Sequence, residues 1–244
     1  MIDAISYDYI IKSIKSEQRH YSSRLVCFDS IDSLTQEAMV QINSKIKRHS
    51  LVGILFCNPN TSFCKTEILS SLNYFHHRSA QYINFFCCGY GAYWSEDTYV
   101  DFHPVAKIDN TEWFYSDKAL VGVIEDFESR TKWKYSGENE LLILDVSPSD
   151  KQDDITINDA LVCNLEKMQK DKAFSSVRAF FEDLIRYARS DELADIWKYS
   201  DKQGQKIGKN FLKDTRIGFL PKKLQVPYHQ AKHYAIREIS NNLS

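Results

Sequence analysis

Three short apolar segments, separated by stretches of helical periodicity, recur at an even interval along this sequence. They span residues 24–28, 51–57 and 82–88, and their cysteines Cys27, Cys57 and Cys87 are 30 residues apart. The intervening residues 31–49 and 65–79 place apolar side chains three and four positions apart, as on one face of a helix. Strands that alternate with helices are usually buried between them in a mostly parallel sheet. The sequence therefore predicts an α/β fold.

The pattern changes in the second half of the chain. The aromatic and polar residues 89–116 predict an inserted loop, and a helix is expected to follow, with Asp117 as its N-cap. Two apolar segments, 140–146 and 159–165, flank a turn-rich stretch and predict an antiparallel hairpin. The amphipathic residues 174–189 predict a closing helix.

Charge divides the chain unevenly. All 244 residues together carry 31 basic and 33 acidic groups, so whole-molecule charge predicts neither a nucleic-acid nor a membrane partner, and 43% hydrophobic residues exclude disorder. Residues 197–244 hold ten basic and three acidic groups, which leaves −9 on the rest of the chain. We expect a boundary near 190–197 and a basic C-terminal region that engages a protein or a nucleic acid. The alternative is a solvated face that neutralises the acidic part.

The predicted order of strands and helices resembles that of the thioredoxin fold. The stretch Phe56 to Lys65 ends in a Cys64-Lys65 pair, where thioredoxin-like proteins place the second cysteine of their redox motif. Thr61 occupies the place of the first cysteine, and Glu138 or Asn139 that of the family's cis-proline. The resemblance implies a thioredoxin-like central mixed sheet flanked by helices over residues 22–190, with an insertion at about 89–116, after an N-terminal helical segment at 1–21.

The residues around Cys64 are also similar to the reactive-cysteine motif of peroxiredoxins, in which a threonine three residues earlier supports the thiolate. That similarity implies a supporting role for Thr61, although Lys65 stands where that family has proline. Independently of any family, a cysteine at the start of a helix lies in the positive end of the helix dipole, which favours the thiolate. The alternative is a small apolar residue in the first turn. Cys57 can pair with Cys64 only if the intervening loop folds tightly.

Other features predict a cytoplasmic protein without cofactor or metal. No secretory signal and no membrane-spanning apolar run is visible, and six cysteines are too sparse for a disulfide scaffold. The pair Gly89 and Gly91 lacks the third glycine of a dinucleotide-binding loop. His229 and His233 have a metal-ligand spacing but no third ligand.

Three functions follow from these residues. The first is a non-catalytic binding or scaffolding protein that engages its partner through the aromatic insertion and the basic C-terminal region. Its proposed contacts are Tyr90, Tyr93, Trp94, Lys198, Lys202, Lys206, Lys209 and Lys213. The second is a thiol-dependent peroxidase or oxidoreductase in which Cys64 is the nucleophile, Thr61 and the helix N-terminus stabilise its thiolate, and a distant cysteine resolves it. The third is an α/β enzyme that acts on a nucleotide-like ligand at the strand end formed by Asn58 to Glu67.

Overall fold

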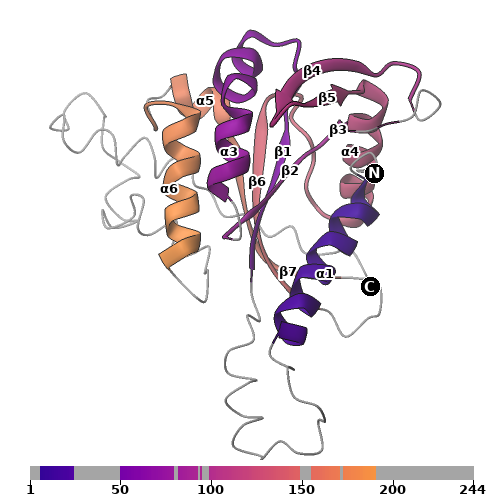
Figure 1. Cartoon of the computed structure of the whole chain (residues 1–244), viewed down its shortest axis with the longest axis vertical. Coiled ribbons are helices and arrows are strands. Elements are labelled where there is room, and N and C mark those ends of the chain that lie inside the picture. The colour runs from indigo at the N-terminus through magenta and orange to yellow at the C-terminus, as the bar shows by residue number, and fades with distance from the viewer. Residues whose placement is uncertain are drawn as a thin grey trace, which may run out of the picture.

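The computed structural model describes residues 6–24, 50–79, 82–92, 94, 99–148, 155–170 and 173–190, apart from some side chains at element ends. Within these residues the chain forms two sheets and a set of covering helices (Figure 1). The larger sheet has four strands in the order β2-β1-β6-β7, and the smaller has three in the order β3-β5-β4. The chain is therefore a mixed α/β protein, in agreement with the predicted class.

The larger sheet is built from segments that the apolar pattern predicted. Its strands are β1 (Ser50–Phe56), β2 (Asn84–Cys87), β6 (Glu140–Pro148) and β7 (Ile155–Asn164). β1 pairs in parallel with β2 and antiparallel with β6, which pairs antiparallel with β7. Buried branched side chains dominate β1 and β6, as expected of central strands with both faces covered.

Helices cover both faces of this sheet. α3 (Leu72–Ser79) and α6 (Val177–Ser190) lie on one face, and α1 (Tyr7–Arg24) and α4 (Asp117–Arg130) lie on the other (Figure 1). The short helix α5 (Leu165–Lys170) follows β7 directly. None of the helices among the described residues has the length and apolar character that crossing a bilayer requires.

The two faces of β1 pack against different helices. Phe56 points to the side of α1 and α4, where its ring lies 5.9 Å from that of Phe127 on α4. On the opposite face the aromatic ring of Phe85 stacks on Phe181 of α6 at 4.9 Å and 2°. Gly53 makes this approach possible, because a Cβ atom there would lie 2.4 Å from Phe85 Cδ1.

The sequence pattern predicted a single helix over residues 65–79, but the segment after β1 is less regular. It begins with η2, a π-helical turn (Cys64–Ile68), continues as η3, a 3₁₀ turn (Leu69–Ser71), and only then becomes α3. Side-chain hydroxyls compete here for the helix carbonyls. Thr66 Oγ1 donates to Ser62 O at 3.0 Å, and Ser70 Oγ donates to Thr66 O. Such back-bonding disturbs a regular helix.

The insertion at 89–116 was predicted as a loop, and this prediction is wrong. It forms the smaller sheet, with β3 (Tyr90–Ala92), β4 (His103–Ile108) and β5 (Thr111–Tyr115) all antiparallel. The strands are too short, and their apolar alternation too interrupted, to stand out in the sequence. Gly89 introduces them with a φ of +82°, a conformation that favours glycine.

The N-cap of α4 is also not the one predicted. Ser116 holds that position, and its Oγ accepts a hydrogen bond from Ala119 N at 3.1 Å. Asp117 is instead the first helical residue, and its carboxylate accepts a hydrogen bond from the Tyr115 hydroxyl at 2.9 Å. A carboxylate of Asp101 completes the helix start by accepting from Lys118 N and from Ser116 Oγ.

Several predictions lie outside the described residues. They concern the strand at residues 25–28, the helix at 31–49 and the whole basic region at 197–244 with its five lysines. Arg24, which was predicted to begin that first strand, is the last residue of α1. The boundary near 190–197 and the histidine pair at 229 and 233 are likewise outside.

Candidate functional site

The candidate site lies where β1 ends and η2 begins, on the face of the sheet that α3 covers. A six-residue loop connects Cys57, just past the strand, to Cys64, the first residue of η2. The loop folds back sharply because the carbonyl of Asn58 accepts hydrogen bonds from Thr61 N at 3.2 Å and from Thr61 Oγ1 at 2.9 Å. The Asn58 side chain accepts a further bond from Asn60 N. This turn brings both ends of the loop together.

The tight loop places the two thiols in contact. The Sγ atoms of Cys57 and Cys64 are 3.2 Å apart, and neither cysteine forms a disulfide. Both are buried, with 1% of Cys57 and none of Cys64 exposed. A disulfide bond has an S–S length of about 2.05 Å, so the sulfur atoms need to move together by only about 1.2 Å to form one. The loop therefore meets the condition for pairing that the sequence left open.

Tyr90, the first residue of β3, completes the site from a distant part of the chain. Its hydroxyl oxygen lies 3.4 Å from each of the two sulfur atoms and donates a hydrogen bond to Cys57 O at 3.0 Å. A hydroxyl has a single proton, so it serves either this carbonyl or a thiolate at Cys64, and it accepts from a thiol in the first arrangement. Tyr90 thus has the position of a switchable hydrogen-bond donor.

The electrostatics of the pair favour charge on one sulfur. Hydrogen bonding from Cys57 lowers the pKa of Cys64, against the opposing effect of burial, and Tyr90 adds to the lowering. Burial raises the pKa of Cys57 well above its usual value of 9.0, and the neighbouring Cys64 raises it further. When both thiols are protonated, Cys64 donates to Cys57 Sγ. Loss of the Cys64 proton reverses this bond, so that Cys57 keeps its proton and donates to the thiolate, which accounts for both directions. Cys64 is therefore the better nucleophile of the two.

Thr61 acts through the backbone. Its hydroxyl donates to Asn58 O, and its oxygen accepts a hydrogen bond from Cys64 N at 3.1 Å. The side chain therefore caps the helical segment that begins at Ser62, just before η2, and it holds Cys64 through the backbone N–H. Asn139, at the start of β6, lies beside it, with Nδ2 3.5 Å from Thr61 Oγ1, and also donates to Glu166.

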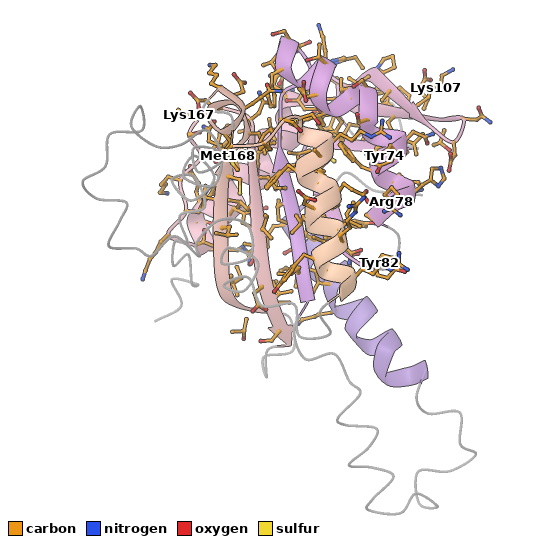
Figure 2. The ribbon with its side chains drawn as sticks, turned by 90° about the vertical axis from the view of Figure 1, so that its left-hand side faces the viewer. Tyr74, Arg78, Tyr82, Lys107, Lys167 and Met168 are labelled. Atoms are coloured by element: carbon orange, nitrogen blue, oxygen red, sulfur yellow. The ribbon has the colours of Figure 1, made fainter. Side chains whose placement is uncertain are left out.

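A second set of contacts holds the helices over this face. Tyr74 and Arg78 of α3 both donate to the carboxylate of Glu182 on α6, Tyr74 at 2.7 Å (Figure 2). Glu67, in η2, accepts from Val177 N at 3.1 Å and so ties the start of α6 to the segment that carries Cys64. The segment that carries Cys64 is therefore hydrogen-bonded to α6, and α6 is in turn hydrogen-bonded to α3.

The remaining predicted residues are distributed differently from the expectation. Tyr90 and Trp94 are 1% and 9% exposed, so they are not an exposed contact surface; they pack inward, the alternative to a contact role for aromatic loop residues. Tyr93 and all five lysines lie outside the described residues. Of the cluster predicted at 58–67, Asn58, Asn60 and Thr61 form the loop, whereas Glu67 contacts α6.

Sequence reasoning missed Tyr90 as a partner of the thiols, since 26 residues separate it from Cys64. The one sequence signal for the thiol pair was the position of Cys57 directly after a buried strand. Among the described residues, no three His, Cys, Asp or Glu side chains are grouped so that they could hold a metal ion. Comparisons with family models, with curated proteins and with solved structures gave no match for the chain.

Proposed function

We propose that this chain is a thiol-based oxidoreductase in which Cys64 is the reactive thiolate and Cys57 resolves it. The observation that carries the proposal is the 3.2 Å distance between the two sulfur atoms. The lowered pKa of Cys64 supports the assignment of roles, because the thiolate is the nucleophile in sulfur chemistry. The proposal retains Cys64 from the sequence and adds the partner that thiol exchange needs.

A thioredoxin-like domain is part of the same proposal. Its support is the order of the strands β2-β1-β6-β7, with β1 and β2 parallel and the other neighbours antiparallel. The reactive cysteine also follows the first of these strands at a helix start. The resemblance implies a cis-proline that faces the redox site, but the described residues contain no cis peptide bond. Asn139 faces Thr61 at this position. The redox pair is therefore proposed to use Cys57 rather than a residue at position 61.

Burial of both sulfur atoms argues for a small oxidant, and we take a hydroperoxide as its class. The Cys64 thiolate attacks the peroxide oxygen, the O–O bond breaks, and the alkoxide or hydroxide that leaves takes up a proton from solvent. Cys64 is then a sulfenic acid. Cys57 loses its proton and attacks Cys64 Sγ, and the S–O bond breaks. The released hydroxide takes that proton as water, leaving a disulfide that two equivalents of a thiol reduce again.

Peptide mapping after treatment with hydrogen peroxide tests the proposal directly. One equivalent of peroxide should convert the reduced protein to a form with a Cys57–Cys64 disulfide. In Cys57→Ser the same treatment should leave a sulfenic acid at Cys64 that a dimedone probe labels, whereas Cys64→Ser should stay unlabelled. Cys163→Ser, which removes another buried thiol, is the matched control and should behave as wild type. Thiols that remain free, or a disulfide between other cysteines, would refute the assignment.

A binding role, in which Cys57 and Cys64 are structural residues, is the second candidate. The burial of both sulfur atoms is the observation that favours it. Exposures of 1% and zero are also what two structural cysteines in a core would have. The two roles differ in one measurable property. In a binding protein, Cys64 would react with peroxide no faster than Cys163, and Cys57→Ser would leave its oxidation unchanged. The basic region at 197–244 would then be the part of the chain to test for partners.

A further inference from the structure

A pocket lies between α3 and strands of both sheets. Its volume is about 110 Å³. Leu72 and Phe75 of α3 form one wall, Phe85 of β2 contributes a second, and Ile108 and Trp113 of β4 and β5 close the third. Neither Cys57 nor Cys64 lines the pocket, but Tyr90, which contacts both thiols, does.

The lining determines what kind of molecule fits. None of the described residues that line the pocket is a carboxylate, a lysine or an arginine; the polar ones are His76, Ser79, Cys87 and Tyr90. A charged ligand would lose part of its hydration without meeting a side chain of fixed opposite charge. The pocket is smaller than an engineered cavity of about 150 Å³ that binds benzene. Because it is open to solvent, it still suits about one ring or a branched aliphatic group that fills it in part.

Tyr90 connects the pocket to the thiols. It lines the pocket, while its hydroxyl oxygen lies 3.4 Å from both Cys57 Sγ and Cys64 Sγ. A molecule in the pocket would contact the residue whose single hydroxyl proton goes either to Cys57 O or to a thiolate at Cys64. Rotation of the O–H bond alone directs the proton to one acceptor or the other, since both lie within hydrogen-bonding range.

We propose that this pocket is a binding site for a compact, uncharged, largely apolar molecule or substrate group of about one ring, and that its occupant alters the reactivity of Cys64 through Tyr90. The ligand site rests on the pocket alone, whereas the effect on Cys64 rests on the proposed function. His76 and Ser79 give the occupant a place for one hydrogen-bonding group. For a probe of this size we expect a dissociation constant on the order of 1 mM.

Benzyl alcohol is a suitable probe, with benzoate as its charged counterpart of almost the same shape. Both are titrated into the full-length reduced protein while the indole N–H signal of Trp113, assigned by its loss in Trp113→Phe, is followed by NMR. Benzyl alcohol should shift this signal saturably, and benzoate at the same concentrations should not. Ser79→Phe, which adds a ring to the lining, should abolish the shift. Ser129→Phe, the same change at an exposed residue of α4 outside the pocket, should preserve it.

The rate of Cys64 oxidation by peroxide provides the second readout. Saturating benzyl alcohol should change this rate at least about twofold in wild type and in Ser129→Phe, and leave it unchanged in Tyr90→Phe. No saturable shift, equal shifts with benzoate, or a shift that persists in Ser79→Phe would overturn the ligand site. A normal shift with an unchanged oxidation rate would overturn the coupling through Tyr90. A normal shift in a protein whose Cys64 never oxidises would overturn the proposed function and the coupling, but support the ligand site.

Discussion

Removal of the Tyr90 hydroxyl by Tyr90→Phe should slow the oxidation of Cys64 while leaving the fold in place. The hydroxyl lies 3.4 Å from Cys64 Sγ and is one of the two hydrogen-bonding groups that lower the pKa of this thiol. A hydrogen bond to a charged group contributes about 1.5 kcal/mol or more. The proton leaves Cys57 O when it serves the thiolate, so the net effect is smaller than a full hydrogen bond. Because 1.4 kcal/mol corresponds to about a factor of ten, the oxidation rate near neutral pH should fall by up to about tenfold.

The same substitution should also destabilise the protein. The hydroxyl donates to Cys57 O at 3.0 Å, and a buried acceptor left without its donor costs about 1–3 kcal/mol. The ring of Tyr90 keeps its packing, including its contact with Tyr115 at 4.9 Å, so the loss should not exceed that range. Urea unfolding measures the stability, and quenched peroxide reactions followed by mass spectrometry measure the rate between about pH 5.5 and 9.

Tyr115→Phe is the matched control, because it removes a neighbouring buried hydroxyl that bonds to Asp117. This variant should lose stability and keep the wild-type oxidation rate. Its pH profile should coincide with that of wild type, whereas the profile of Tyr90→Phe should move to higher pH, since the thiolate loses a donor. An unchanged rate in Tyr90→Phe, or equal slowing in the two variants, would refute the role given to the Tyr90 hydroxyl.

Two further predictions concern the frame that holds the site. Gly53→Ala should lower the free energy of unfolding by about 1–3 kcal/mol in urea titrations, because its Cβ would lie 2.4 Å from Phe85 Cδ1. Gly122→Ala, in a helix and with open space around it, should instead be stabilising by about 0.5–1 kcal/mol, and equal effects would contradict this argument. Arg78 chiefly holds the pKa of Glu182 at about 2, below its usual 4.5. Because the carboxyl of the folded protein resists protonation, the ion pair adds to the free energy of unfolding. This stabilisation is complete above about pH 5 and is lost as pH falls toward 2. Glu182→Gln should therefore cost about 1 kcal/mol at pH 7, after screening by solvent, and almost nothing at pH 2, and a pH-independent cost in thermal unfolding would exclude this ion pair as the cause.

The strands of the larger sheet, and most of the helices that cover it, could be predicted from their apolar residues. A strand that is buried on both faces is apolar along almost its whole length. Residues 51–57 and 140–146 are almost continuously apolar, and they form the two central strands β1 and β6. The strong amphipathic pattern of residues 174–189 likewise predicted α6, within three residues of its start. Periodicity dominates here because each segment is long enough to show one clear period.

The smaller sheet could not be predicted in this way. β3 has three residues and β5 has five, and β4 contains Pro104 at a register irregularity. Strands this short do not establish an alternation, and their pairing depends on contacts between segments rather than on local preference. The result matters for the site because β3 begins with Tyr90. An insertion treated as a loop gave no reason to expect its first aromatic residue beside a cysteine.

The pairing of Cys57 with Cys64 depends on how six intervening residues fold, and no simple spacing rule specifies that. The sequence shows a proline and two asparagines, which favour turns, but many turns would leave the thiols apart. The turn that forms is the one in which the Asn58 carbonyl accepts two hydrogen bonds and Thr61 Oγ1 accepts one from Cys64 N. The residue that the family resemblance implied as a support for the thiolate is thus a support for the loop.

The irregular start of the helix also bears on how the pair would work. Closing the bond requires the sulfur atoms to approach by about 1.2 Å, and a rigid helix would resist this movement. Cys64 instead belongs to a single π-helical turn, a feature that often occurs at functional sites, and Ile68 at its end has φ −107° and ψ −63°. A wide turn can tighten without breaking the packing of α3, which begins only at Leu72. Oxidation should therefore alter hydrogen exchange in residues 64–71 and leave that of α3 nearly unchanged, whereas a change that spreads along α3 would mean that the thiols are held by the whole helix.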